Sequence, residues 1–120
     1  MTTNAMTVQG IYASAAVSDF EAGLVWYEAL MGRPPDDQPI PNMAQWRNMG
    51  AAGLQLWKDD ARAGKGLMTI VVPNLATERS RLSGLGIQLV NEAKGAFGAV
   101  AQIFDAEGNR INIAEPPKAS

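Results

Sequence analysis

The chain has 120 residues, a mass of 12.8 kDa and a formal net charge of -2. This length is enough to bury one hydrophobic core and too short for two, so we expect a single domain over residues 1–120. Basic residues are scattered singly, no apolar run could span a membrane and the first ten residues lack a signal-peptide pattern, which argues against nucleic-acid or membrane partners and favours the cytoplasm.

The first predicted element is a strand over residues 8–17. Side chains alternate along a strand, so Tyr12 lies on the face opposite Ile11. The strand is followed by Ser18 and Glu21, whose spacing is that of a capping box, in which a hydroxyl and a carboxylate satisfy free backbone N–H groups at a helix start. We therefore expect a helix to begin at this point.

The apolar residues of this helix recur at helical spacing and form one stripe: Phe20, Leu24, Tyr27 and Met31. This stripe should pack on a sheet, and Gly32 is placed to end the helix. Trp26 and Leu30 lie beside the stripe. They would cover a second subunit or a neighbouring element of the same chain.

Four prolines in residues 33–41 leave room for a short edge strand at most. Two strands are then predicted over residues 43–49 and 53–58, joined by small residues as in a hairpin. In the second of these strands the two leucines share one face, while Gln55 and Trp57 share the other.

After a polar linker over residues 59–65, the plan of the chain begins again. We expect a strand over residues 67–72 and a helix that Asn74 caps and that ends near Gly84 and Gly86. Strands over residues 87–90 and 100–104 follow, separated by a glycine-containing loop.

An acidic turn closes the second half of the chain and leads into a strand over residues 110–115. In this turn Gly108 and Asn109 can adopt positive φ angles, which is typical of a hairpin. In the strand Arg110 and Asn112 share the face opposite two isoleucines. That polar face suggests a groove, although plain solvent is the more common explanation for polar residues opposite a core face.

The two halves match in several places at once. Asp19 aligns with Asn74 as a helix cap, and Leu-Gln-Leu at 54–56 aligns with Ile-Asn-Ile at 111–113. We therefore predict an α+β fold of two βαβββ repeats, at about residues 8–59 and 67–115. They should form a curved mixed sheet around a cavity, with the helices on its outer face.

The segments VSDFEAGLVWYEALMG and FDAEGNRINIAE, in this order in a doubled plan, resemble the vicinal oxygen chelate superfamily of glyoxalases, bleomycin resistance proteins and ring-cleaving dioxygenases. Residues 43–53 with Trp46 are similar to a small glyoxalase-like branch. The resemblance implies a cavity on a curved sheet, a homodimer and, in the enzymes of the superfamily, a divalent metal in the cavity.

The positions that hold the metal in the superfamily fall here on Tyr12, Gln55, Leu67 and Asn112. This set offers no negative charge at neutral pH, and the whole chain contains no Cys and no His. We therefore expect no metal, no other cofactor, and no metal-dependent glyoxalase or dioxygenase activity.

The first functional hypothesis is that the cavity binds a small, partly aromatic organic molecule. The expected ligand contacts are the tryptophans, hydrogen-bonding side chains and one cation: Tyr12, Trp46, Gln55, Trp57, Arg110 and Asn112. One alternative is a metal-independent lyase or isomerase in which Tyr12 donates a proton beside Arg110. The other is a dimeric scaffold without a ligand, in which the tryptophans are core residues.

Overall fold

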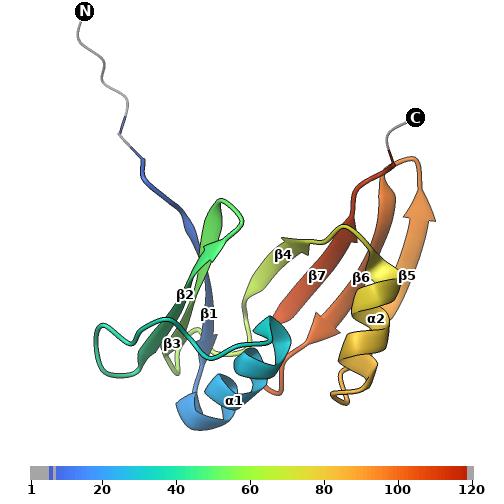
Figure 1. Ribbon diagram of the computed structural model, residues 1–120. Helices are drawn as coiled ribbons and strands as arrows, with labels where there is room; N and C mark the ends of the chain where they lie inside the picture. Colours follow the sequence, from blue (N-terminus) through green and yellow to red (C-terminus); the bar gives the residue numbers. More distant parts are fainter. Residues whose placement is uncertain (1–5, 7, 119–120) are drawn as a thin grey trace, which may run out of the picture.

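The computed structural model describes residue 6 and residues 8–118 (Figure 1). Residues 1–5 and 7, part of the stretch examined for a signal peptide, and residues 119–120 lie outside the described residues. In chain order the elements are β1 (Tyr12–Val17), α1 (Phe20–Met31), β2 (Met43–Met49), β3 (Ala52–Lys58), β4 (Leu67–Val71), α2 (Leu75–Ser83), β5 (Val90–Gly95), β6 (Gly98–Phe104) and β7 (Arg110–Glu115).

The strands form two mixed sheets, with the orders β1-β3-β2 and β4-β7-β6-β5. In each sheet the first strand runs parallel to the last strand of its half, β1 to β3 and β4 to β7, and the hairpin strands pair antiparallel. The α+β class and the repeated plan are therefore confirmed. The first half has one strand fewer, because its proline-rich connection touches the sheet only through an isolated bridge between Asp37 and Gln45.

The start of α1 differs from the prediction. Asp19, not Ser18, is the N-cap, and its carboxylate accepts a hydrogen bond from the Ala22 N–H at 3.1 Å. The backbone N–H and hydroxyl of Ser18 donate instead to the Glu107 carboxylate, both at 2.8 Å. The capping box with Glu21 is therefore wrong, because a carboxylate from the far half of the chain takes its place.

The other helix ends lie where the sequence predicts them. Gly32 ends α1 with φ 78° and donates its N–H to the Glu28 carbonyl, and Asn74 caps α2 by accepting from the Thr77 N–H at 2.9 Å. Gly84 lies at the end of α2. Each cap is a local contact, so the local residue pattern was sufficient to predict it.

Two strands, β1 and β5, differ from their expected limits by more than two residues. β1 begins at Tyr12, because residues 8–10 extend away from the body of the chain (Figure 1), while the Ile11 carbonyl still accepts a hydrogen bond from the Gly53 N–H at 3.0 Å. β5 spans Val90–Gly95 instead of 87–90. Its polar residues pair with β6 as an exposed edge strand, with a bulge at Asn91, whose φ is 53°.

One hydrophobic cluster is shared by both halves of the chain. From α1 it includes Phe20, Tyr27 and Leu30, which are buried, while Trp26 packs edge-on against Tyr27 with ring centroids 4.9 Å apart. The apolar residues beside the predicted stripe therefore pack within the chain. Val25 is the exposed large apolar residue of this helix, at 69%.

The β6–β7 turn joins the two halves. Asp105 accepts hydrogen bonds from the Tyr27 hydroxyl at 2.8 Å and from the Asn109 amide at 2.7 Å, and these three side chains are buried. The Asn109 amide also donates to the Ala16 carbonyl at 2.8 Å, and its oxygen accepts from the Gly66 N–H at 2.7 Å. The predicted hairpin is confirmed here, with positive φ at Gly108 alone.

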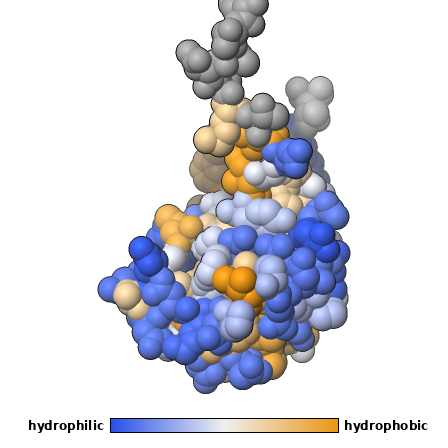
Figure 2. All heavy atoms as spheres, turned by 90° about the vertical axis from the view of Figure 1, so that its left-hand side faces the viewer, coloured by the Kyte–Doolittle hydropathy of each residue, from blue (hydrophilic) through white to orange (hydrophobic). Residues whose placement is uncertain are grey.

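The surface is polar over most of the side formed by β2 and the loop before it (Figure 2). Hydrophobic atoms gather at the top of this side, next to the residues drawn in grey. In the segment before β1, Met6, Val8 and Ile11 are all exposed. Neither described helix has the length and apolar character needed to cross a membrane.

Candidate functional site

A chain of side-chain hydrogen bonds runs across the face of β2 and β3 that lies opposite the core. Gln45 and Gln55 are register partners on these strands. The Trp57 indole N–H donates to the Gln55 carbonyl oxygen at 3.1 Å, and the Gln55 amide donates to the Gln45 oxygen at 3.2 Å. Gln55 therefore uses both ends of its amide within the sheet, and one of them holds the indole of Trp57 in place.

Trp57 lines a cleft of about 470 Å³ at the ends of β1 and β3. The cleft is bordered by the two strands and the linker between β3 and β4: Ser14, Ala15, Ala16, Trp57, Asp59, Arg62, Lys65 and Gly66. This volume falls within the range of roughly 300 to 1,000 Å³ that small-molecule sites occupy. The cleft therefore combines an aromatic ring with polar and charged groups at a size suited to a small ligand.

The linker folds into two successive turns at the rim of this cleft. The Arg62 N–H donates to the Asp59 carbonyl and the Lys65 N–H donates to the Arg62 carbonyl, each at 3.2 Å. The Asp59 carboxylate accepts from Arg62 at 2.7 Å and from the Ala61 N–H at 3.1 Å. The hydrogen bond from Arg62 holds the pKa of Asp59 below its usual range, so this carboxylate stays ionised at neutral pH.

Two glycines fix the linker against the second half of the chain. Gly64 has φ 76°, and a Cβ at this position would overlap the carbonyl group of Glu107. Gly66 donates its N–H to the side chain of buried Asn109. The residue pattern of this segment predicts only a polar linker, because its folded form depends on contacts with residues 43 positions further on.

Tyr12 lies on the same face of the first sheet as Gln55 and Trp57. Its register partner is Gly53, and the Tyr12 ring occupies the space where a side chain at position 53 would stand. Tyr12 is 37% exposed. The absence of a side chain at Gly53 therefore allows the phenol ring to lie flat across the neighbouring strand.

Arg110 and Asn112 lie on the second sheet. The Asn112 amide donates to the Thr69 hydroxyl at 3.2 Å, and Thr69 is its register partner on β4. Gln55 is paired in the same way with Ser14 on β1, so the two repeats place an amide opposite a hydroxyl at equivalent positions. Arg110 begins β7 and is exposed, and its backbone N–H donates to the Gly66 carbonyl at 3.0 Å.

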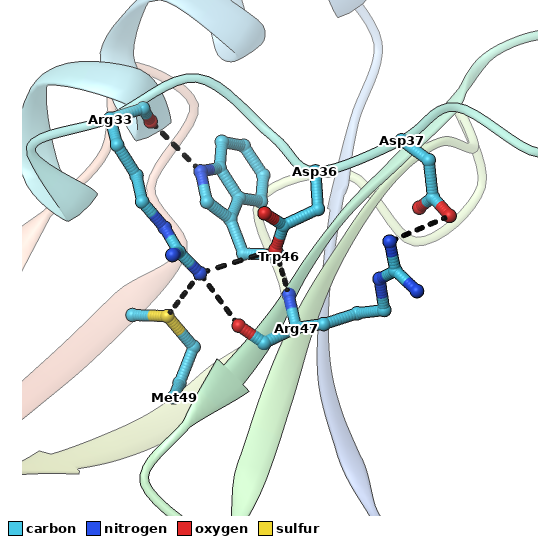
Figure 3. A network of polar contacts seen from close by, with 6 residues as sticks. All are labelled: Arg33, Asp36, Asp37, Trp46, Arg47 and Met49. Atoms are coloured by element: carbon cyan, nitrogen blue, oxygen red, sulfur yellow. Dashed lines mark hydrogen bonds and ion pairs between the residues drawn. The ribbon is translucent and has the colours of Figure 1, made fainter.

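Trp46 is not part of this face, and its predicted role as a ligand contact has to be corrected. It is fully buried in the core, opposite Leu54 on β3, and its indole N–H donates to the Arg33 carbonyl at 2.9 Å (Figure 3). A side chain with no exposed surface offers nothing to a ligand. The face on which it lies is set by the register of β2 against β3, which its own strand does not reveal.

A polar network fastens the proline-rich connection to β2 around Trp46 (Figure 3). Arg33 donates to the Arg47 carbonyl at 2.6 Å, and the Arg47 N–H donates to Asp36 at 2.5 Å. The Arg47 guanidinium lies 3.7 Å from Asp37. These contacts replace the strand pairing that the first half lacks, and they hold the buried indole of Trp46 under the loop.

In the part of the chain that the structure describes, no three His, Cys, Asp or Glu residues are grouped as metal ligands would be. The expected ligand contacts thus fall into three places. Tyr12, Gln55 and Trp57 share one face of the first sheet, Arg110 and Asn112 lie on the second sheet, and Trp46 is in the core.

Solved structures similar to this chain cover almost its whole length. A glyoxalase/bleomycin resistance protein from Catenulispora acidiphila is 28% identical, with a TM-score of 0.82 over 92% of this chain and 100% of that one. TnmS3, an antibiotic-binding protein from Streptomyces sp. CB03234, is 22% identical, with a TM-score of 0.77 over 97% and 100%. No protein-family model and no curated protein matches the chain.

A lactoylglutathione lyase from Agrobacterium tumefaciens is 14% identical to the chain, with a TM-score of 0.74 over 94% of this chain and 96% of that one. The same fold therefore occurs in a protein named for binding an antibiotic and in a protein named as a lyase. A choice between binding and catalysis has to rest on the side chains of this chain.

Proposed function

Because the chain has the fold of the vicinal oxygen chelate superfamily, we propose that it binds a small, partly aromatic organic molecule and does not transform it. The observation that carries this proposal is the half-buried indole of Trp57. It lines a cleft of about 470 Å³, and its N–H is already bonded to Gln55. A ring held in this way offers its face to a planar ligand at little cost in conformational entropy.

The contacts assigned to the ligand follow from this geometry. Trp57 provides the stacking surface, while Gln55 acts as the positioning residue that fixes its ring. The hydroxyl groups of Ser14 and Tyr12 lie on the same face of the sheet and are exposed. Arg110 and Asn112 remain proposed contacts for the part of a ligand that reaches the second sheet.

The proposal includes no metal. Of the four positions that bind metal in the superfamily, Leu67 has no donor atom and Gln55 has both ends of its amide engaged within the sheet. Tyr12 offers a phenol and Asn112 an amide. A divalent cation stripped of water needs several anionic or strongly donating ligands, and this set does not provide them.

Two features favour binding over catalysis. The carboxylate in the cleft, Asp59, is ion-paired with Arg62 and its pKa is lowered by that contact, so it is a poor acid or base at neutral pH. The alternative, a metal-independent lyase or isomerase, would use Tyr12 as the proton donor. Among the described residues no side chain is hydrogen-bonded to the Tyr12 hydroxyl to receive or supply a proton.

The proposed assembly is a homodimer. Helix α2 packs on one face of the second sheet, and the opposite face exposes large apolar side chains: Leu67 at 58%, Val71 at 65%, Val90 at 41% and Phe104 at 42%. Monomeric proteins rarely leave such residues together on one sheet face. We propose that a second copy of the chain covers this face, so that a ligand in contact with Arg110 and Asn112, which lie on it, is enclosed between the two copies. Trp26 and Leu30, the residues first expected to do so, pack inside the chain.

A thermal-shift screen of aromatic antibiotics and metabolites tests the proposal, because a ligand bound only by the native state raises the melting temperature. A true ligand should also quench tryptophan fluorescence, and both effects should be lost in Trp57→Ala and kept in Trp26→Phe. Mass spectrometry of the recovered ligand should show it unchanged. A ligand that stabilises Trp57→Ala as much as the wild type, or is converted during incubation, contradicts the proposal.

A further inference from the structure

We propose that the cleft beside Trp57 selects ligands that carry an acidic group, such as a carboxylate, sulfonate or phosphate, next to the aromatic ring. Lys65 is the residue that holds this group, and Trp57 receives the ring. The inference rests on the proposed function and narrows its ligand class to aromatic acids.

The side chains that line the cleft carry more positive than negative charge. Its lining includes two cations, Arg62 and Lys65, against the single carboxylate of Asp59. Arg62 and Asp59 neutralise each other at 2.7 Å. Among the described residues no carboxylate lies within ion-pair distance of Lys65, so one positive charge at the rim remains uncompensated. The chain as a whole is negative, at -2, so this local excess does not reflect the overall charge.

The nearby carboxylates are already occupied. Asp60 accepts from Lys58 at 3.0 Å. Glu107, whose carbonyl touches the linker at Gly64, directs its carboxylate to the backbone N–H groups of Ser18 and Asp19 at 2.8 and 3.0 Å. Both carboxylates thus have partners other than Lys65, and the positive charge at the rim can be met by a ligand.

The segment that presents Lys65 is built into the fold. Two turns with 3.2 Å hydrogen bonds set the path from Asp59 to Lys65. The close approach of Gly64 to the β6–β7 turn and the 2.7 Å bond from Gly66 to Asn109 then fix the linker on both sides of Lys65. A cation on a preorganised segment loses less entropy when it binds an anion than one on a free loop.

The hydroxyl of Ser14 completes the polar lining as a further donor at the cleft wall. The ring of Trp57 lines the same cleft. A ligand whose ring stacks on Trp57 can then place its acidic group at the Lys65 rim. An acidic group bound in this way exchanges water for charge-assisted hydrogen bonds, whereas a cationic group would meet the excess positive charge.

Three probes with the same ring test the inference: 2-naphthalenesulfonate, its neutral sulfonamide and the cationic 2-naphthylmethylammonium ion. Dissociation constants from titration calorimetry should rise in that order, because the sulfonate is expected to bind most tightly and the ammonium ion most weakly. The sulfonate should bind about tenfold more tightly than the sulfonamide, as expected for one charge-assisted contact. Raising the salt concentration should weaken the sulfonate and leave the sulfonamide unchanged.

Lys65→Gln should remove most of the tenfold preference without changing sulfonamide binding. Lys94→Gln is the matched control, since Lys94 is an exposed lysine on β5 of the other sheet and the same charge is removed. It should leave both affinities at the wild-type value. The melting temperatures of both variants verify that they are folded.

The outcomes separate the two proposals. If the sulfonamide binds as tightly as the sulfonate, or if Lys65→Gln keeps the preference, the charge selection is wrong while Trp57-dependent binding still stands. If none of the three probes binds and Trp57→Ala changes nothing, the binding function of this cleft fails, and the charge selection fails with it.

Discussion

The Tyr27 hydroxyl on α1 donates a 2.8 Å hydrogen bond to the Asp105 carboxylate in the β6–β7 turn, across 78 positions of sequence. Both side chains are buried. Burial, together with the negative charge of Asp105, raises the pKa of Tyr27 far above its ordinary value, so the phenol remains a donor at all physiological pH values. This contact connects the first helix to the last hairpin.

Tyr27→Phe should therefore destabilise the protein by roughly 1 to 3 kcal/mol, because it leaves a buried carboxylate oxygen with one donor fewer. Urea unfolding followed by circular dichroism measures the loss. Tyr12→Phe is the control, since it removes a hydroxyl from an exposed ring and should change the unfolding midpoint little. Equal effects of the two substitutions would contradict the buried contact.

The hydrogen bonds to Glu107 predict that the protein loses stability at acidic pH. Hydrogen bonds from the backbone N–H groups of Asp19 and Ser18 lower the pKa of Glu107 in the folded state. A lowered folded pKa contributes stability above the unfolded value, about 4.3 for Glu, and this contribution is lost as pH falls through the folded pKa. Urea midpoints should thus fall more steeply below about pH 4.3 in the wild type than in Glu107→Gln.

At pH 7 Glu107→Gln should be less stable than the wild type, because a neutral amide oxygen is a weaker acceptor for the α1 N–H groups. The two proteins should approach equal stability in acid, where Glu107 is protonated. Parallel stability curves from pH 7 to pH 3 would show that the carboxylate does not stabilise the start of α1.

The two strand tryptophans should behave in opposite ways. Trp57→Ala should weaken ligand binding by roughly 1 to 3 kcal/mol while lowering stability little. Trp46→Ala should lower the free energy of unfolding by about 3 to 5 kcal/mol, because it opens a cavity in the core. Calorimetric titration and chemical denaturation of both variants make the comparison. If Trp57→Ala unfolds the protein, the scaffold interpretation replaces the binding one.

Local sequence signals were sufficient to predict where most of the helix ends lie. They were not sufficient to predict which face of a sheet a side chain occupies when that face depends on the register between two strands. Gly32 and Asn74 mark helix ends through contacts within one turn, and alternation sorted Gln55 and Trp57 onto one face. Trp46 was misassigned because a bulge between it and Met49 shifts the register of the β2–β3 hairpin, and no pattern within β2 reveals that shift.

Metal content is the next test. The protein should purify without stoichiometric metal, and a chelator should leave its melting temperature unchanged, because the four superfamily positions offer two amides, a phenol and a leucine. Elemental analysis of the purified protein checks this. One equivalent of tightly held zinc, nickel, iron or manganese, lost together with stability on chelation, would overturn the expectation.

The homodimer is tested at the exposed face of the second sheet. Light scattering at micromolar concentration should give about twice the 12.8 kDa mass of the chain. Val71→Lys should reduce this mass to that of the monomer, because it places a charge in the proposed interface. Val25→Lys puts the same charge on the exposed side of α1 and should leave the dimer intact. A wild-type mass of 12.8 kDa would remove the dimer from the proposal.

The candidate site was harder to predict than the fold. The sequence predicts only a linker for the segment that contains Asp59, Arg62 and Lys65. A usable signal was present, because an Asp and an Arg three positions apart can form an ion pair and they directly follow a strand whose tryptophan points outward. Their place beside Trp57 depends on Gly64 and Gly66 meeting the β6–β7 turn. Contacts of that range have no counterpart in local periodicity.

The dependence of α1 on Glu107 also concerns the order in which the chain folds. The backbone N–H groups of Ser18 and Asp19, directly before α1, obtain the Glu107 carboxylate as an acceptor only when the β6–β7 turn has formed, 88 and 89 positions later. The first half of the chain, made earlier during synthesis, therefore waits for the second half before the segment that leads into its helix is held in place. We expect a single cooperative folding step in which the last hairpin and the first helix form together, at the slow rate typical of contacts with high sequence separation.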